Sequence, residues 1–493
     1  MERKKLLVML SVAVLVVINI IFCAVQLGNT DKPDAVPEDQ TQTNPSHDVD
    51  SPVSQTIEWM GWQSALAGVN GASVYDSHSF SGSPKDAIAS GEQIIICQRN
   101  NDACLIRYGE KTGWVNASEL ELQGEPTVYQ PDDNSWQPAS LAGTDMAAQL
   151  DSVADKYDCI GVQMAIITDG KISHLYEYGY GNRGEKIPMS SDTKLRVASI
   201  TKVIVGMGVM SMADMGIVDI DEDISRYWSQ SIANPKHADT PITFRHLLTH
   251  TSSMKDFGYK KRETQALIDN LQKADSYMST APGDIASYKY NNSAICTAGA
   301  LAGHAAGCNF DSYIRQYFYQ SLGVDASFHA ANIQAADLLS PTYNEGTTTM
   351  TVKDLLNVKY FGGPDDDYSL YAGGMIISAK DMAKLVCILI GGGQYEGMYY
   401  LKESTVDEML RVHYETEDYD QCLVLRHQDQ LLGGESLYYH NGNLLGVFSM
   451  ICFDPETGDG MVVITNGAKN VKLEDCVYNV CGDLAETAKA LWK

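Results

Sequence analysis

Serines followed three residues later by a lysine are the residues whose spacing most directly suggests chemistry. In a helix, positions i and i+3 lie on one face, so the ammonium can hold the serine oxygen and favour its deprotonation. The pattern occurs three times in the 493 residues, at Ser191/Lys194, Ser199/Lys202 and Ser252/Lys255. Since about two such pairs are expected by chance in a chain of this length, the pattern alone does not identify a nucleophile.

Sequence context favours Ser199. Ser191 lies in a polar turn, and Ser252 is followed by polar residues rather than by an apolar helix. Only Ser199 precedes a long apolar run, VIVGMGVMSMADMG, which predicts a buried helix over 199–215. The positive end of such a helix and its free N–H groups would stabilise an oxyanion. The structural alternative is a helix-capping serine followed by a surface lysine.

Six segments occur in an order that resembles the class C β-lactamase and penicillin-binding serine hydrolase family. The resemblance covers roughly residues 140–490 and implies an α+β domain of the β-lactamase/transpeptidase-like type, an antiparallel sheet with a helical region. The segments are RVASITK (196–202), DIDEDISRYW (219–228), ITFRHLLTHTSSM (242–254), PGDIASYKYNN (282–292), AGGMIISAKDMAKL (372–385) and HNGNLLGVFS (440–449).

The resemblance implies a catalytic set of Ser199, Lys202 and a tyrosine. Its Tyr-x-Asn motif, measured back from Gly299, falls on Tyr290 to Asn292, and Tyr288 is the alternative. Ser199 would attack an acyl carbonyl, and Lys202 would lower the proton affinity of the serine and of the phenol. A phenol with an ordinary pKa near 10 needs such a cation to act as a base near neutrality.

The resemblance also implies residues that hold the substrate. Asn292 would bond the substrate amide, and His440, which opens the third motif with Gly442, would position a substrate carboxylate or tune the tyrosine. Because that position is a histidine, we expect the local charge to depend on pH. The backbone N–H groups of Ser199 and Asn443 would form the oxyanion hole.

The expected reaction is acyl transfer on D-amino-acid peptides or esters of the cell wall. The alternatives are a true β-lactamase and a catalytically inactive ligand-sensing protein, because pocket shape is not encoded in the motifs. We expect no cofactor and no metal, since neither C-x-x-C nor H-E-x-x-H occurs. His246 and His250, four residues apart, are interpreted as a structural helix end.

The elements that must position these residues can be predicted for a domain spanning 140–493. Two strands at each end of it, with helices between them, predict an antiparallel sheet that joins the ends of the domain. The strands are expected at 161–168 and 171–178, joined by Asp169-Gly170, and at 447–453 and 461–465. A final helix is expected over about 475–491.

The N-terminal 28 residues predict a transmembrane signal-anchor. Residues 6–25 carry no charge, and as a helix they would span about 30 Å, the thickness of a bilayer core. Arg3, Lys4 and Lys5 precede them, so the N-terminus is expected in the cytoplasm and the catalytic domain outside, on a single-pass cell-membrane protein. The alternative is a cleaved signal peptide.

Between the anchor and the catalytic domain we expect a tether (29–56), an SH3-type barrel (57–123) and a linker (124–139). Short strands are expected at 93–97, 103–108 and 113–115, and 105–120 resembles the C-terminal half of bacterial SH3-type domains. Such domains often bind cell-wall peptides, and a spacer without a ligand is the alternative. A literal Lys-Thr-Gly at 111–113 is interpreted as a turn.

Composition excludes nucleic acid as a partner, but it does not decide whether any cysteines form disulfides. The formal net charge is −27, and no block of basic residues offers the footprint that nucleic acid requires. The eleven cysteines are too few for a disulfide scaffold, but Cys97 with Cys104 and Cys476 with Cys481 are close enough in sequence to bridge outside the cell.

Overall fold

The computed structural model describes most of the chain beyond the predicted anchor and tether, which lie outside the described residues. It covers residues 59–492 except 77–78, 101, 110, 124–136, 258–261 and 360–366. Within these ranges, no helix combines the length and the apolar character needed to cross a bilayer.

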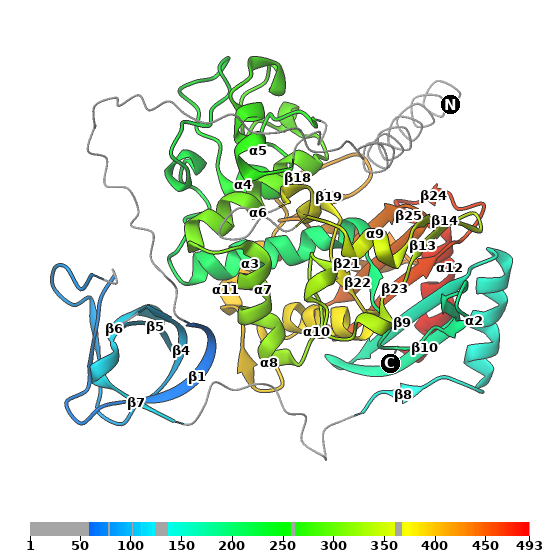
Figure 1. Cartoon of the computed structure of the whole chain (residues 1–493), viewed down its shortest axis with the longest axis horizontal. Coiled ribbons are helices and arrows are strands. Elements are labelled where there is room, and N and C mark those ends of the chain that lie inside the picture. The colour runs from blue at the N-terminus through cyan, green and yellow to red at the C-terminus, as the bar shows by residue number, and fades with distance from the viewer. Residues whose placement is uncertain are drawn as a thin grey trace, which may run out of the picture.

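An antiparallel five-stranded sheet occupies part of the segment predicted as an SH3-type barrel (Figure 1). The predicted strand 103–108 is confirmed as β5, and 93–97 and 113–115 fall inside β4 and β6. The Lys-Thr-Gly sequence begins β6, so its interpretation as a turn was wrong. The strands, in sheet order, are β6 (Lys111–Asn116), β5 (Ala103–Tyr108), β4 (Gln93–Asn100), β1 (Trp59–Ala67) and β7 (Leu120–Leu122), with a separate ribbon of β2 (Ala72–Val74) and β3 (Asp86–Ile88).

No disulfide joins any of the ten described cysteines, so the two bridges considered from sequence do not form. Cys97 packs with the core of the catalytic domain, whereas Cys104 packs inside the N-terminal sheet. The two thiols therefore lie on opposite faces of the sheet. Cys476 is half-buried in a hairpin, and Cys481 is fully buried on the following helix.

The main sheet confirms the antiparallel arrangement expected for the catalytic domain. Strand β9 pairs with β23, so segments near the two ends of the domain lie side by side in the middle of the sheet (Figure 1). The strands, in sheet order, are β11 (Ile187–Pro188), β10 (Lys171–Asn182), β9 (Gly161–Thr168), β23 (Asp459–Asn466), β22 (Val447–Asp454), β21 (Glu435–Leu444), β20 (Arg426–Leu431), β19 (Asp420–Gln421) and β18 (Tyr414–Glu415), and β8 (Ala139–Ser140) pairs with β10.

Helices cover both faces of this sheet because its strands are apolar on both sides. On β9, Val162, Met164 and Ile166 pack with α2 (Asp145–Lys156) and α12 (Asn479–Ala488), while the alternate residues face α10 (Ala379–Ile390). The predicted final helix began too early. A hairpin of β24 (Leu473–Glu474) and β25 (Val477–Tyr478) precedes α12, and its turn residues have left-handed φ angles.

The helical region surrounds α3 (Thr201–Asp214), which is buried on all sides as its apolar sequence requires. A single 3-10 turn, Ala198–Ile200, precedes α3, so the predicted helix 199–215 is confirmed with slightly shorter bounds. The remaining α-helices are α4 (Phe244–Leu248), α5 (Thr264–Leu271), α6 (Asn292–Ala306), α7 (Phe310–Ile314), α8 (Gln320–Leu322), α9 (Val352–Leu356) and α11 (Glu403–Leu410). Three two-stranded ribbons pair β12 (Leu195–Arg196) with β15 (Ile376–Ile377), β13 (Thr342–Asn344) with β14 (Thr347–Met350), and β16 (Gln394–Tyr395) with β17 (Met398–Tyr399).

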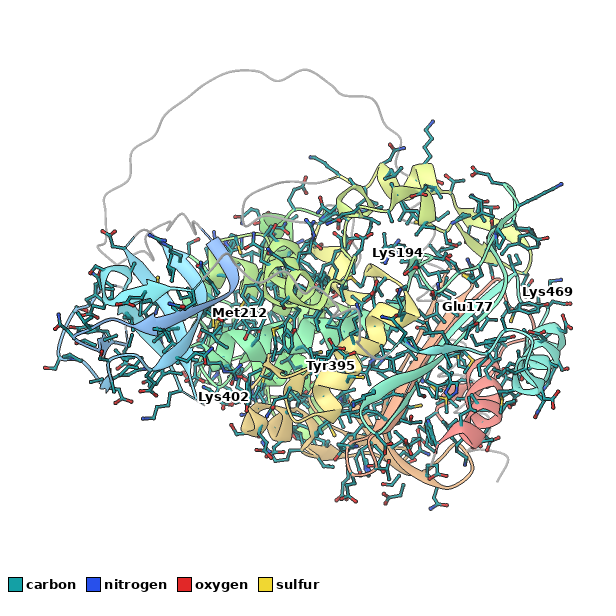
Figure 2. All side chains as sticks on the ribbon, turned by 90° about the horizontal axis from the view of Figure 1, so that it is seen from below. Glu177, Lys194, Met212, Tyr395, Lys402 and Lys469 are labelled. Atoms are coloured by element: carbon teal, nitrogen blue, oxygen red, sulfur yellow. The ribbon has the colours of Figure 1, made fainter. Side chains whose placement is uncertain are left out.

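The N-terminal sheet docks directly on this helical region, at the end of α3 that is remote from Ser199. Leu105 of β5 is fully buried in the core of the catalytic domain. The Thr112 hydroxyl donates to the carbonyl of Asp214 at 2.8 Å, and an Arg107 Nη2 lies 4.0 Å from the Asp214 carboxylate. Figure 2 shows Lys402, whose backbone N–H donates to the same carboxylate at 2.7 Å, on this side of the catalytic domain.

Candidate active site

Ser199 and Lys202 are joined by a hydrogen bond at the start of α3. The Lys202 ammonium donates to Ser199 Oγ at 3.0 Å and to the carbonyl of Ala372 at 2.6 Å, and its side chain is fully buried. Ser199 itself is half-buried, and the residue before it, Ala198, has a left-handed φ of 53°. The turn therefore presents the serine oxygen to the lysine while leaving it open on one side.

The other two Ser-x-x-Lys pairs lack this geometry. Lys194 is buried against Asp381, with 2.7 Å between Nζ and Oδ2, and Ser252 is itself buried. Among the described residues, Ser199 and Lys202 are the one pair of the three whose side chains are hydrogen-bonded. The pair that the following apolar run favoured is therefore the pair whose side chains meet.

Tyr290 lies next to Lys202, and Tyr288 does not. The Lys202 ammonium is 5.0 Å from the centre of the Tyr290 ring. The Tyr288 hydroxyl instead contacts Tyr419 at 2.8 Å and donates to Gln421 at 2.9 Å, and burial raises the pKa of Tyr288. Of the two tyrosines left open by the sequence, the geometry therefore favours Tyr290.

Strand β21 forms the wall opposite α3 and comes close to the nucleophile. A Cβ at Gly442 would lie 2.7 Å from the backbone nitrogen of Ser199 and 2.5 Å from Ser449 Oγ. Any larger residue would push the strand away, since real Cβ atoms do not approach that closely. This glycine lets β21 bring Asn443 to the same pocket as Ser199.

His440, also on β21, is buried and neutral rather than a pH-dependent charge. Burial, together with the nearby Arg426 and Lys202 cations, lowers its pKa well below the ordinary value. Its Nδ1 lies 2.7 Å from the carbonyl of Asn441, a geometry in which Nδ1 carries the proton and donates. The expectation that this histidine makes the local charge vary near neutrality was therefore wrong.

A small pocket gathers the predicted residues from three separate segments. Ser199, Asn292 and Asn443 line it, with Ala198, Ala372, Gly373 and Leu444 completing the wall. Asn292 reaches the pocket as the first residue of α6, whose start is capped by the Asn291 side chain through a 2.8 Å bond from the Ala294 N–H. Tyr290 is half-buried beside the ring of His440, 6.2 Å away between ring centres.

Arg426 is a functional candidate that sequence reasoning missed. Its guanidinium lies 5.3 Å from the centre of the Tyr290 ring and 4.3 Å from that of Tyr419. It stands on β20 directly opposite Tyr439, the neighbour of His440. No local pattern marks this arginine, because only the pairing of β20 with β21 brings it to the site.

His250 and Asp256 were also missed as neighbours of the Tyr-x-Asn segment. The His250 ring centre is 4.7 Å from that of Tyr290. Asp256 accepts the Ser293 N–H at 2.8 Å and so holds the start of α6, and burial raises the pKa of Asp256. His246 caps α4, as the structural interpretation of the two histidines predicted for it. No cluster of three possible metal ligands occurs among the described residues.

The arrangement can carry out acyl transfer. A buried ammonium bonded to a serine oxygen favours the alkoxide that attacks a carbonyl, and a phenol beside the same cation can exchange the proton. The Ser199 backbone N–H at the helix start and the Asn443 N–H on β21 are candidates for an oxyanion hole.

Comparisons with known proteins agree with this geometry. A model of the Beta-lactamase family matches residues 144–479, more than half of the chain. Esterase EstB of Burkholderia gladioli is 28% identical over 219 residues, which are 39% of this chain and 54% of the esterase. The D-alanyl-D-alanine-carboxypeptidase/endopeptidase AmpH of Escherichia coli (strain K12) is 26% identical over 166 residues, 32% of this chain and 43% of that enzyme.

The chain spans about half the length of the curated relatives it matches. Among solved structures, a class C β-lactamase from Rhodobacter sphaeroides shares the fold, with a TM-score of 0.57 at 17% identity over 70% of this chain and 99% of that one. The family match, the shared fold and the joined Ser199 and Lys202 lead to one conclusion: the chain belongs to the Beta-lactamase family.

Proposed function

We propose that this chain is a membrane-anchored extracellular serine hydrolase that forms an acyl-enzyme on Ser199 with D-amino-acid peptides or esters of the cell wall. The observation that carries the proposal is the 3.0 Å bond from the buried Lys202 ammonium to Ser199 Oγ, at a pocket that also holds Asn292 and Asn443. The Escherichia coli relative named as a D-alanyl-D-alanine-carboxypeptidase supports the peptide substrate.

The proposed reaction has two steps. Ser199 Oγ attacks the acyl carbonyl, its proton passes through Tyr290 to the leaving amine or alkoxide, and the scissile C–N or C–O bond breaks. Water then gives a proton to Tyr290 and attacks the acyl ester. The bond between the carbonyl carbon and Ser199 Oγ breaks, Tyr290 passes the proton to Oγ, and the acid leaves. The N–H groups of Ser199 and Asn443 bind the oxyanion in both steps, and the Asn292 amide bonds the amide of a peptide substrate.

Arg426 favours a substrate with a free carboxylate over a neutral ester. It lies over the Tyr290 ring, half-buried, and none of the described acidic side chains forms an ion pair with it. A planar guanidinium left without an acidic partner can bind a carboxylate with two parallel hydrogen bonds. The C-terminal carboxylate of a peptide would meet this requirement, and so would the carboxylate of a penicillin.

Intact-mass spectrometry of the detergent-solubilised full chain tests the nucleophile. We expect a stable adduct after penicillin treatment, and its absence in Ser199→Ala. An adduct with a fluorophosphonate alone would favour the esterase alternative, which the match to EstB supports. A penicilloyl adduct that hydrolyses within seconds would favour a β-lactamase. If the wild type gains no mass with either reagent, the result contradicts the proposed acyl-enzyme and favours the inactive ligand-sensing alternative.

Replacing Arg426 separates the two substrate classes. In Arg426→Met, kcat/KM for a D-alanyl-D-alanine peptide should fall about 100-fold, because a charge-assisted bidentate contact is lost. Turnover of a neutral ester should stay within about threefold. Equal losses on both substrates would contradict carboxylate binding.

We also propose the location and the role of the N-terminal segments. The uncharged run 6–25, preceded by three basic residues, supports a single-pass anchor with the catalytic domain outside. The resemblance of 105–120 to bacterial SH3-type domains supports binding of wall peptides by the N-terminal sheet. Fractionation with protease protection of intact cells tests the first proposal, and sedimentation of the full chain with purified cell wall tests the second.

A further inference from the structure

His250 occupies an unusual backbone position beside the site. It follows α4, its side chain is buried, and its φ of 62° lies in the left-handed region, which few non-glycine residues adopt and which surrounding contacts can stabilise. The Asn291 and Lys289 backbone groups supply such contacts. The turn after α4 is thereby tied to the segment that leads into α6.

His250 accepts two hydrogen bonds, from the backbone N–H groups on either side of Tyr290. The Lys289 N–H donates to the His250 carbonyl at 2.9 Å, and the Asn291 N–H donates to His250 Nδ1 at 3.3 Å. The imidazole also packs on the phenol, with ring centres 4.7 Å apart and ring planes tilted by 48°. The residue before Tyr290, the residue after it and its own ring are therefore all held by one histidine.

This contact requires a neutral imidazole with the proton on Nε2. A nitrogen that accepts the Asn291 N–H cannot carry a proton of its own. Burial, reinforced by the Lys202 and Arg426 cations, lowers the pKa of His250 well below the ordinary value. The Lys202 and Arg426 cations, which lie near the Tyr290 ring, thus also favour the neutral His250 imidazole that accepts the Asn291 N–H.

We propose that His250 is a positioning residue that sets the Tyr290 phenol against Lys202 and so controls the rate of acylation. The inference rests on the proposed role of Tyr290 as the proton carrier. His250 is not among the residues that line the pocket, so its effect should appear in the chemical step and not in substrate binding.

Two substitutions of His250 separate positioning from mere occupancy. Asn can return an acceptor close to the place of Nδ1 and tolerates a left-handed φ, whereas Leu fills similar space without an acceptor. His246→Asn is the matched control, because His246 also accepts a backbone N–H at Nδ1, from Thr243 at 3.4 Å, but packs against Gly283. Each variant of the full chain is treated with penicillin, and acylation is followed by quenched-flow mass spectrometry.

We expect His250→Leu to acylate about 100-fold more slowly than wild type, because positioned proton transfer contributes on this scale. The penicillin concentration that gives half of the maximal rate should stay within about threefold of the wild-type value. His250→Asn should recover most of the rate, and His246→Asn should match wild type. A His250→Leu rate equal to wild type, or a change confined to the half-maximal concentration, would overturn the proposal.

Two further variants keep the test decisive. If His250→Leu does not fold, His250→Asn is compared with His250→Gln, whose oxygen stands one bond further out, and equal rates overturn the proposal while a slower Gln variant supports it. Tyr290→Phe distinguishes a failure of the proposed Tyr290 role from a failure of the His250 positioning role. If it acylates normally, the proposed role of Tyr290 falls and this inference with it. If it is inactive while His250→Leu is fully active, only the positioning role is wrong.

Discussion

At the scale of single residues, two buried lysines in Ser-x-x-Lys pairs have different partners. Lys202 meets a serine and a carbonyl oxygen, whereas Lys194 is neutralised by Asp381, with 2.7 Å between Nζ and Oδ2. A buried ammonium held for chemistry opposes stability, because its desolvation is only partly compensated. A buried ammonium in an ion pair keeps its partner from being left as an isolated charge.

Lys202→Met and Lys194→Met should therefore show opposite defects. The first should slow penicillin acylation at least about 100-fold with an unchanged or higher melting temperature. The second should leave acylation per folded molecule near wild type but reduce the free energy of unfolding by about 3 to 5 kcal/mol, since Asp381 loses its closest cation. Mass spectrometry and denaturant titration measure the two effects. A stable but inactive Lys194→Met would contradict this division.

The two histidines beside Tyr290 lead to a prediction on pH. Burial, with the Arg426 and Lys202 cations adding to it, holds the pKa of both His440 and His250 well below the ordinary value near 6.5. Both rings are neutral in the folded chain, and both bind protons in the unfolded chain below about pH 6.5. Below this pH the unfolded state binds more protons than the folded state. The free energy of unfolding is therefore unaffected by these two rings above about pH 6.5 and falls as the pH drops below that value.

We accordingly expect the melting temperature to fall below about pH 6.5 while kcat/KM shows no inflection there. The acylation rate between pH 7.5 and 6, corrected for the folded fraction, measures the second effect. His440→Gln, which removes one of the two titrating rings, should flatten the loss of stability. An activity step near pH 6.5 that vanishes in His440→Gln would show that this imidazole titrates in the folded site.

At the scale of elements, the close approach of β21 to the turn before α3 determines whether the pocket exists. Gly442→Ala places a methyl group 2.7 Å from the Ser199 nitrogen, so the strand must move away. We expect acylation about 100-fold slower, as when one oxyanion-hole donor is lost, with the fold retained. Gly184→Ala is the control, because its Cβ would meet nothing closer than 3.5 Å. Quenched-flow acylation of both variants is the measurement, and a fully active Gly442→Ala would contradict the close approach.

The bounds of some elements could be predicted from the sequence, and those of others could not. Strand β9 matches its predicted bounds because an apolar run ends at Asp169-Gly170, where the backbone turns with left-handed φ angles. The final helix was predicted four residues too early, since the hairpin before it uses left-handed turns at Asp475 and Cys476 that no local pattern marks. Local periodicity predicts elements but not such turns.

Some residues of the candidate site could be predicted from sequence motifs, and others are brought to the site only by the fold. The residues carried by ordered motifs, Ser199, Lys202 and Asn443, come together as the resemblance implied. Arg426 was missed, and His250 was interpreted only as part of a helix end, because strand pairing and a left-handed turn bring these residues to Tyr290 without leaving a sequence pattern. Burial reversed the expectation for His440, whose charge depends on surroundings that a sequence does not display.

At the scale of the whole molecule, the N-terminal sheet is part of the same packed structure as the catalytic domain. Cys97 and Leu105 are buried in the catalytic domain's core, and Arg107 and Thr112 contact Asp214 at the far end of α3. The helix that begins beside Ser199 thus ends against another sheet, about 20 Å away at 1.5 Å per residue. The face of the sheet that docks is closed to other ligands, so wall peptides would have to bind elsewhere on it.

This packing predicts that the two parts unfold together. Wild-type full chain should give one cooperative calorimetric transition, because separating the parts exposes fully buried Leu105. Leu105→Arg should place a charge in the junction and split the transition in two, whereas Val69→Arg, at a position 81% exposed on the same sheet segment, should leave one. Penicillin acylation should survive in both variants, since no pocket residue lies at the junction. Two transitions in the wild type would mean that the contact is too weak to couple the parts, and the sheet would then act as an independent module beside the hydrolase.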